Sequence, residues 1–243
     1  KYVADCAAEY GVPIRVGSNS GSVEKEYLNS DMPLYKKLAE SALKSARLLE
    51  KQSFYDIVLS AKASSVKDTV KAYEYLSSIC DYPLHIGVTE AGGGQGALIK
   101  SAIGIGSLLI KGIGDTIRVS ITGNPVEEVK AAKEILKAAG LLPHVDIISC
   151  PTCGRCRYNM EEFVKQVQIL TENINKSFKI AVMGCAVNGP GEAREADLGI
   201  AGGDKKMAIF KKGKVIKTVN EQEALQYFTN EIQSLINGSE NKC

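Results

Sequence analysis

The 243-residue sequence has no tryptophan, no strong net charge and no long apolar run. Its formal net charge is only +2, so no overall field favours a nucleic-acid or anionic-membrane partner. No apolar stretch approaches the roughly 20 residues that a membrane-spanning helix needs. The first residues lack a charged segment followed by an apolar one, so we expect no secretory signal. With 44% apolar and 24% charged residues, the composition is that of a soluble globular protein.

Cysteine is present in an unusual arrangement. The seven cysteines are an odd number, and three of them form a C-x-x-C-x-x-C run at Cys150, Cys153 and Cys156. Three thiols on one tight turn are too close together for an ordinary disulfide framework, and thiolate-rich turns hold zinc or iron–sulfur clusters. The odd count and the metal-like spacing favour a reducing compartment, so we expect a cytoplasmic protein.

A second segment, residues 184–192, carries Cys185 and then Glu192. Its glycines and proline predict a loop that is not helical. A carboxylate beside thiolates would leave one coordination position for a substrate, as in open catalytic metal sites, although Glu192 could equally be a surface acid. The residues alone leave two questions open. Zinc also accepts four sulfurs, and Cys156 is either a fourth ligand or a bystander.

Strand and helix patterns alternate through the first 140 residues. We expect strands at 13–17, 56–62, 83–90 and 116–122, and helices at 33–52, 65–79, 97–111 and 125–139. This alternation predicts parallel strands with crossover helices. Four such units are the C-terminal half of a TIM-like (β/α)₈ barrel, which would have two exposed edges. Because exposed edges favour aggregation, we expect that four upstream units are missing or supplied by another chain. Residues 2–10 look like a helix without a start signal, so we also expect a truncated chain.

Polar residues gather near the C-terminal ends of these strands, where a barrel has its active site. They are Arg15 with Asn19, Lys62, Glu90, and Arg118 with Ser120. Lys62 and Glu90 are either rim residues or a structural salt bridge. His85, in mid-strand, is expected to be a satisfied barrel-interior residue rather than a base.

Two glycine patterns accompany the strands. The glycine-rich segment 92–96 precedes a helix, so its amides could bind a phosphate, or it could be a flexible barrel loop. Gly104-x-Gly106 follows no strand, so it is no dinucleotide fingerprint and instead predicts close helix–sheet packing.

A domain boundary is expected near residues 140–144, which gives domains 1–142 and 143–243. The second is predicted as a small α+β module with strands at 145–149, 179–184 and 198–201, helices at 159–175 and 221–236, a hairpin at 205–219 and a polar tail at 237–243.

Lysines crowd the hairpin at Lys205, Lys206, Lys211, Lys212, Lys214 and Lys217. They are either a solvated edge that discourages strand pairing or a docking site for an acidic electron carrier. Interleaved aromatics are scarce, which gives no basis for nucleic-acid binding.

Six segments together resemble the 4-hydroxy-3-methylbut-2-enyl diphosphate synthase family. They are residues 14–22, 60–64, 87–93, 112–120, 149–153 and 183–193, and they follow the family's order along essentially the whole chain. The resemblance implies a TIM-like barrel followed by a small α+β iron–sulfur domain. It implies a [4Fe–4S] cluster held by three cysteines and one glutamate, which by motif position are Cys150, Cys153, Cys185 and Glu192.

The resemblance also implies an activity. A family member is an oxidoreductase of isoprenoid biosynthesis by the methylerythritol phosphate pathway. It reductively opens 2-C-methyl-D-erythritol 2,4-cyclodiphosphate to 4-hydroxy-3-methylbut-2-enyl diphosphate with two electrons from ferredoxin or flavodoxin. It is a homodimer in which the cluster domain of one subunit closes over the barrel mouth of the other.

Site roles follow for the rim residues. The substrate-binding set is expected to be Arg15, Asn19, Lys62, Arg118 and Ser120, because a cyclic diphosphate needs cationic and polar donors. Glu90 is the candidate for proton transfer or for orienting a hydroxyl, and Glu192 is the cluster ligand that can leave for substrate.

Two departures from the family matter. The N-terminal barrel half is absent from the sequence, so we expect the chain to be inactive alone. Cys156 stands where a non-ligating residue is expected, and it could compete with Glu192. The competing hypothesis is a non-catalytic binding module in which Cys150, Cys153, Cys156 and Cys185 form a closed zinc site.

Overall fold

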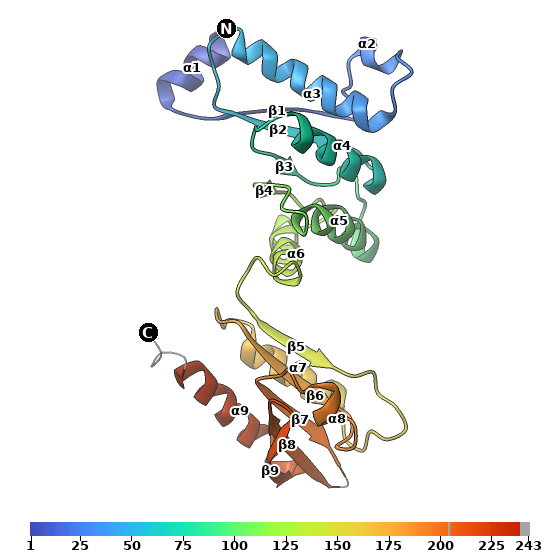
Figure 1. The fold of residues 1–243 in the computed structure, drawn as a ribbon, viewed down its shortest axis with the longest axis vertical. Helices are drawn as coiled ribbons and strands as arrows, with labels where there is room; N and C mark the ends of the chain where they lie inside the picture. Colours follow the sequence, from blue (N-terminus) through green and yellow to red (C-terminus); the bar gives the residue numbers. More distant parts are fainter. Residues whose placement is uncertain (204, 239–243) are drawn as a thin grey trace. The chain divides into compact units, whose positions relative to one another are not determined.

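The computed structural model describes residues 1–203 and 205–238 (Figure 1). The chain forms two compact units, one of residues 1–142 and one that begins at Pro143. Most of the polar tail expected at 237–243 lies outside the described residues. Among the helices that the structure describes, none combines the length and the apolar character needed to cross a membrane.

The first unit contains parallel strands, as the alternating pattern predicts. They are β1 (Ile14–Asn19), β2 (Ile57–Lys62), β3 (His85–Ile86) and β4 (Thr116–Ile117). β1 pairs with β2 and β3 pairs with β4, while a single bridge between Leu59 and Leu84 joins β2 to β3. β1 and β4 each have one side that pairs with no strand in the described part of the chain. The result is an open partial barrel.

One helix precedes the first strand of this unit, and helices follow every strand. They are α1 (Tyr2–Tyr10), α2 (Lys25–Leu28), α3 (Leu34–Glu50), α4 (Val66–Ile79), α5 (Gly94–Leu109) and α6 (Pro125–Ala138). Two starts have caps: the Ser65 side chain accepts a hydrogen bond from the Asp68 amide, and Asn124 accepts one from the Val126 amide. α3 lies along β1 (Figure 1), and the core includes the fully buried Leu38, Leu59 and Tyr73.

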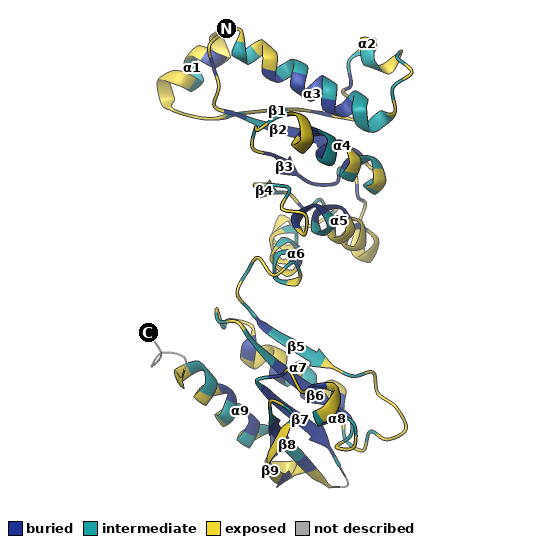
Figure 2. Cartoon of the chain, in the orientation of Figure 1, coloured by how far each residue is buried: buried dark blue, intermediate teal, exposed yellow. Residues whose placement is uncertain are grey.

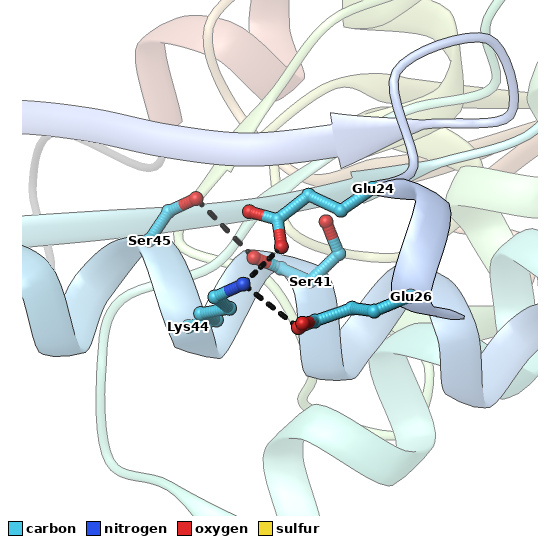
Figure 3. A network of polar contacts seen from close by, with 5 residues as sticks. All are labelled: Glu24, Glu26, Ser41, Lys44 and Ser45. Atoms are coloured by element: carbon cyan, nitrogen blue, oxygen red, sulfur yellow. Dashed lines mark hydrogen bonds and ion pairs between the residues drawn. The ribbon is translucent and has the colours of Figure 1, made fainter. Parts of the chain in front are cut away.

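The short helix α2, which the sequence analysis did not predict, is clamped onto α3 (Figure 3). The Lys44 ammonium, on α3, contacts the carboxylates of both Glu24 and Glu26, the latter at 2.7 Å. Directly after Lys44, the Ser45 hydroxyl donates to the Ser41 carbonyl at 3.2 Å, within α3. The clamp fixes the connection that leaves the end of β1, where Asn19 lies.

The second unit is built on one five-stranded sheet. Its strands are β5 (Val145–Ser149), β6 (Phe178–Met183), β7 (Leu198–Gly202), β8 (Lys206–Lys211) and β9 (Lys214–Asn220), in that order across the sheet. β5, β6 and β7 are parallel, whereas β7–β8 and β8–β9 are antiparallel. β7 is buried along its whole length, and the edge strand β9 is exposed at all but one position (Figure 2).

Alternate residues of a strand point to opposite sides of the sheet, and this sheet has buried apolar residues on both sides. Helices therefore cover both faces. α7 (Met160–Thr171) and α9 (Glu221–Gly238) share a buried cluster with Ile180 and Ile200 of β6 and β7. On the other face, Met183 and Ala201 pack with Ala193, which follows α8 (Gly189–Glu192).

The existence of α8 corrects the prediction that the segment carrying Glu192 is not helical. Pro190 lies in its first turn, where the missing amide hydrogen needs no helical partner. The Glu192 amide donates to the Asn188 carbonyl at 2.9 Å, which closes the single turn. A glycine- and proline-rich sequence is therefore compatible with one helical turn.

Candidate functional site

A cluster of positive charges lies at the end of β2. Lys62 is the last residue of that strand and its Cα is paired with Asn19 of β1. Partial burial, and then the charges of Arg15 and Arg118, lower the pKa of the Lys62 ammonium to about 8. Its Cε lies 3.6 Å from the point that a Cβ on Gly87 would occupy, so the bare glycine borders the Lys62 side chain. No carboxylate is among the groups that shift the pKa of Lys62. A cluster of cations without a neutralising carboxylate favours an anionic ligand.

Arg15 reaches this cluster from an unexpected place. We predicted it at the C-terminal end of a strand spanning 13–17, but β1 continues to Asn19 and Arg15 is its second residue, opposite Val58. That prediction of position was wrong because the strand runs two residues further. The Arg15 charge nevertheless acts on Lys62 and on His85.

His85 belongs to the cluster, which the sequence analysis did not anticipate. Its side chain is buried, with 7% exposure, and Nδ1 lies 2.8 Å from the Thr116 hydroxyl. Nε2 is buried and has no hydrogen-bond partner among the described residues, so the expectation of a satisfied interior histidine holds for one nitrogen only. Burial, followed by the charges of Lys62, Arg15 and Arg118, lowers the pKa of His85 to about 4. His85 is thus neutral at physiological pH.

The other predicted substrate contacts flank these residues. Asn19 Oδ1 accepts a hydrogen bond from the Gly21 amide at 3.0 Å, so this oxygen holds a turn and only the amide nitrogen remains for a ligand. Arg118 follows β4 and is exposed, and its amide donates to the Ile86 carbonyl at 2.9 Å. Ser120 is two residues further on, beyond the buried Val119. The structure brings Arg15, Lys62 and Arg118 together, with Asn19 beside them.

Glu90 lies in a strained stretch of backbone beyond β3. Its φ angle is +53°, a left-handed conformation that costs a non-glycine residue about 1–2 kcal/mol. The preceding Thr89 amide donates to the Ala63 carbonyl at 3.2 Å, which ties this segment to the end of β2. The charges that act on Lys62 do not include Glu90, so the rim interpretation fits better than the salt-bridge alternative. Strain of this kind concentrates at functional sites.

The glycine-rich segment ends where α5 begins. Gly93 is the N-cap and provides no side-chain cap, and Gly94 is the first helical residue. Amides of this first turn are therefore open to an anion, which is the arrangement expected for phosphate binding.

Both cysteine loops leave the same edge of the sheet in the second unit. Cys150 follows β5 and Cys185 comes two residues after β6, and these strands are parallel neighbours with Ser149 opposite Val182. The Gly184 amide donates to Cys150 Sγ at 3.2 Å, which joins the two loops directly.

Cys156 lies at the same junction. A Cβ on Gly184 would meet Cys156 Sγ at 3.4 Å and Cys150 Sγ at 3.5 Å. Cys153 is exposed on the same turn, and hydrogen bonds from Arg155 lower the pKa of its thiol. The thiols therefore lie on two loops that meet at Gly184, which suits soft-metal chemistry.

Glu192 lies on the single-turn helix α8, whose first residue, Gly189, donates its amide hydrogen to the Cys185 carbonyl at 3.0 Å. Glu192 itself is exposed. In residues 1–203 and 205–238, no three His, Cys, Asp or Glu side chains gather tightly enough to hold a metal ion. The donor set fits an iron–sulfur cluster or zinc by its chemistry, with Cys150 and Cys156 already adjacent.

Comparison with known proteins gives the family. A family profile described as the GcpE TIM-barrel domain matches residues 1–133, and one described as the GcpE protein C-terminal domain matches residues 146–234. The chain belongs to the GcpE family. The family resemblance and the predicted fold class, a partial TIM-like barrel followed by a small second domain, are both confirmed.

Curated relatives within the GcpE family are enzymes. The chain is 55% identical over 238 residues to a protein of Caldanaerobacter subterraneus subsp. tengcongensis named 4-hydroxy-3-methylbut-2-en-1-yl diphosphate synthase (flavodoxin). This chain is also 55% identical to a protein of the same name from Fusobacterium nucleatum and 48% identical to one from Thermotoga maritima. These alignments cover 97%, 93% and 96% of this chain but 67%, 64% and 67% of the relatives. The chain thus spans about two thirds of their length, and the prediction of an enzyme of this family is confirmed.

Proposed function

We propose that this GcpE chain is the larger part of a reductase that opens 2-C-methyl-D-erythritol 2,4-cyclodiphosphate to 4-hydroxy-3-methylbut-2-enyl diphosphate. The observation that carries this proposal is the convergence of Arg15, Lys62 and Arg118 on one point of the partial barrel. The relatives' shared name supports the reaction. A substrate with two phosphate charges would relieve the mutual repulsion of these cations.

The rim residues bind and orient this substrate. The Arg15 and Arg118 guanidiniums are suited to bidentate contact with phosphate oxygens, and the Lys62 ammonium supplies a point charge between them. Asn19 and Ser120 add neutral donors at the margin. The neutral His85 offers its unpartnered Nε2 to a substrate oxygen, since an orphaned buried nitrogen gains most from a new hydrogen bond.

Glu90 is our candidate for proton transfer to the substrate or for orienting one of its hydroxyls. Its exposure leaves the carboxylate free to meet a ligand, and its strained backbone fixes the direction from which it approaches.

By motif position, Cys150, Cys153, Cys185 and Glu192 would hold a [4Fe–4S] cluster in the second unit. When bound, such a cluster supplies reducing electrons and a Lewis-acidic iron to the reaction. Glu192, a hard ligand on an exposed single-turn helix, is the residue placed to give way to substrate. Gly184 lets the cysteine loops approach closely, because a Cβ there would crowd Cys156 and touch Cys150 Sγ.

An acidic one-electron carrier, flavodoxin by analogy with the relatives' names, is the proposed electron donor. Two hairpin lysines are already paired, Lys211 with Glu231 at 2.6 Å and Lys212 with Asp197 at 2.7 Å. Lys206 and Lys214 are exposed, and neither has an acidic partner in the described part of the chain. These two lysines are therefore free to attract an acidic surface.

The hairpin also begins close to the cysteine loops. The Gly203 amide donates to the Lys206 carbonyl at 2.7 Å, and the Ala186 amide donates to the Gly202 carbonyl at 2.7 Å. Ala186 directly follows Cys185, so a carrier bound at Lys206 would lie near the proposed metal ligands. A groove of about 570 Å³ between β9 and α9 extends this surface.

Three further expectations belong to the proposal. The family member is expected to act as a homodimer, which light scattering would test. A reducing cytoplasm suits the free thiols. The chain alone is expected to be inactive, because the open edges of β1 and β4 leave its barrel incomplete.

The test uses the chain extended to the full length of its relatives and reconstituted anaerobically with iron and sulfide. With chemically reduced viologen as donor, mass spectrometry is expected to detect 4-hydroxy-3-methylbut-2-enyl diphosphate. Lys62→Met is expected to lower kcat/KM about 10- to 100-fold, the usual value of a charged hydrogen bond. Lys133→Met, an exposed lysine of α6, is the matched control. Absence of product from a cluster-loaded protein would refute the proposal.

A further inference from the structure

The line along which β2 meets β3 departs from a regular parallel sheet. The two strands are joined by a single bridge, in which Leu59 is opposite Leu84. In a regular parallel ladder of this register, the next hydrogen bond from β2 would run from the Ala61 amide to the His85 carbonyl. The structure has a side chain between these two groups instead. The break lies at His85 and one residue from Lys62, so it falls within the cluster described above.

The inserted side chain is Tyr73 of helix α4. Its hydroxyl accepts a hydrogen bond from the Ala61 amide at 3.2 Å and donates one to the His85 carbonyl at 2.7 Å. The side chain is fully buried, and this burial, opposed by hydrogen bonds with Ser60 and Ala61, raises the pKa of the hydroxyl to about 12. Tyr73 therefore stays protonated at physiological pH. One phenol takes the place of one backbone hydrogen bond and holds β2 and β3 apart.

Thr69, also on α4, holds the next amide of β2 that would face β3. The Ala63 amide donates to the Thr69 hydroxyl at 3.0 Å, and that hydroxyl donates to the Ala63 carbonyl at 3.0 Å. Thr69 is fully buried. The two strand segments meet again where the Thr89 amide donates to the Ala63 carbonyl at 3.2 Å. Hydroxyls of α4 thus bond the backbone on both sides of Lys62, at Ala61 and at Ala63.

The opening between the strands lies beside the Lys62 side chain. Lys62 Cε is 3.6 Å from the point that a Cβ on Gly87 would occupy, and Gly87 is two residues after His85. A shift of β3 relative to β2 would therefore move both His85 and the backbone that Lys62 borders. The charges that act on Lys62 come from Arg15 of β1 and Arg118 beyond β4. Together these three cations form the cation cluster, and α4 supplies the backbone anchors of its central member.

We propose that Tyr73 and Thr69 are positioning residues of the cation cluster. Their hydroxyls set the separation of β2 and β3, and they thereby fix Lys62 and His85 in the relative positions that a phosphate-bearing ligand requires. Neither hydroxyl touches the ligand or transfers a proton in this role. The inference rests on the proposed function for the identity of the ligand, whereas the effect of α4 on Lys62 can be measured without any ligand.

Loss of the Tyr73 hydroxyl has a defined consequence. In Tyr73→Phe the ring still fills the space between the strands, so the Ala61 amide and the His85 carbonyl cannot reach each other. Both groups lose their partner, and buried backbone groups without partners are costly. We expect the end of β2 to loosen and to admit water beside Lys62. Burial is the first cause of the low pKa of Lys62, so this pKa should rise from about 8 toward its ordinary value of 10.5.

Histidine NMR of the 243-residue chain measures this change. The sequence has two histidines, His85 and His144, and a His144→Gln spectrum assigns their signals. His85, with a pKa of about 4, stays neutral above pH 6, and its ring senses the charge of Lys62. Its signals are therefore expected to change with a midpoint near pH 8 in the parent chain and not at all in Lys62→Met. In Tyr73→Phe the midpoint is expected to rise by at least about half a pH unit.

The matched control is Tyr75→Phe on the same helix. The Tyr75 hydroxyl donates to a Glu40 carboxylate oxygen at 2.9 Å, so this variant also removes one tyrosine hydroxyl and one hydrogen bond from α4. Its midpoint is expected to stay near that of the parent, even if its stability falls. The proposal is overturned if Tyr73→Phe keeps the parent midpoint, or if Tyr75→Phe moves it as far.

A second pair of variants covers the case in which Tyr73→Phe does not fold. Thr69→Val removes the hydroxyl that bonds Ala63 and nearly keeps the shape of the side chain, whereas Thr69→Ser keeps the hydroxyl. The His85 midpoint is expected to rise in the valine variant and to match the parent in the serine variant. Equal midpoints in the two variants would contradict the proposal.

Kinetics then connects the positioning to the ligand. In the full-length, cluster-loaded enzyme, Tyr73→Phe is expected to raise the KM for the cyclic diphosphate about five- to tenfold with a smaller change in kcat, because the cations that bind it are displaced. Tyr75→Phe should leave the KM unchanged. An unchanged KM in Tyr73→Phe would overturn the positioning role. If the parent enzyme formed no product, the proposed function would fail, but the NMR result would stand.

Discussion

At the scale of single residues, Lys62 is the group whose protonation should govern ligand binding. Its pKa of about 8 means that the free protein begins to lose this charge just above neutral pH. An anionic ligand favours the charged form and raises the pKa in the complex. Binding is therefore strongest below pH 8 and weakens above it, because the complex must then take up a proton.

Calorimetry with the cyclic diphosphate tests this prediction, since its phosphodiester charges do not titrate in this range. Between pH 8 and 9.5 the affinity is expected to fall by up to about tenfold per pH unit, with proton uptake visible as a buffer-dependent heat. Lys62→Met is expected to bind weakly at every pH and to show no uptake. An unchanged pH dependence in Lys62→Met would assign the effect to another group.

Folding stability should respond to Lys62 with the opposite sign. The pKa is lowered on folding from 10.5 to about 8, so the unfolded chain binds more protons between these values. Stability therefore rises as pH increases through this window, and the unfavourable contribution is fully present below pH 8.

The place of a residue within its strand could be predicted only where the neighbouring residues show where that strand begins and ends. Lys62 was correctly placed at a strand end because a short apolar run, Ile57 to Leu59, marks β2 clearly. Arg15 was misplaced because nothing local shows that β1 runs on to Asn19. The neutral state of His85 depends on charges from other strands, which no local pattern reveals.

At the scale of secondary-structure elements, Gly104 and Gly106 of α5 form a matched pair. The sequence predicted that both serve close helix–sheet packing. A Cβ on Gly104 would approach Val88 Cγ2 to 2.5 Å, whereas one on Gly106 would meet nothing within 4 Å. The prediction is therefore confirmed for Gly104 and wrong for Gly106.

These contacts predict opposite effects of the same substitution. Gly104→Ala is expected to lower the free energy of unfolding by about 1–3 kcal/mol, because overpacking of α5 against Val88, in the segment that follows β3, outweighs the helix propensity of alanine. Gly106→Ala is expected to raise it by about 0.5–1 kcal/mol, because the helix gains propensity at no steric cost. Urea unfolding of the two variants measures both values. Equal effects of the two substitutions would contradict the packing seen here.

The elements themselves were predicted to different degrees. Strong amphipathic periods located α3, α4, α6 and α9, and cap residues fixed the start of α6. β3 and β4 are far shorter than expected, because extended chain beyond them makes only isolated hydrogen bonds. The short α2 depends on the Lys44 clamp, a contact between distant residues.

At the scale of the whole molecule, the lysines of the hairpin are expected to control the electron donor. Lys206→Glu with Lys214→Glu should raise the KM for flavodoxin about five- to tenfold at low ionic strength, because two attractive charges become repulsive. The effect should shrink in high salt. Turnover driven by reduced viologen should be unchanged, since a small dye needs no docking surface.

The control for this pair is Lys133→Glu on α6, which reverses the charge of one exposed lysine in the first unit. Steady-state kinetics of the full-length, cluster-loaded enzyme provides the measurement. An equal loss with viologen, or an equal loss in the control, would show that the hairpin acts through stability or net charge rather than docking.

The open sides of β1 and β4 have a consequence for protein engineering. In the described part of the chain, the open side of β1 presents a row of unpaired backbone amides and carbonyls and that of the two-residue β4 a short one, and each can accept one more strand. The chain is thus suited to serve as the acceptor half of a split enzyme, with the remaining third of a relative supplied as a separate polypeptide. Reconstitution in that format would place the joining of the barrel, and with it the catalytic output, under the control of whatever brings the two pieces together.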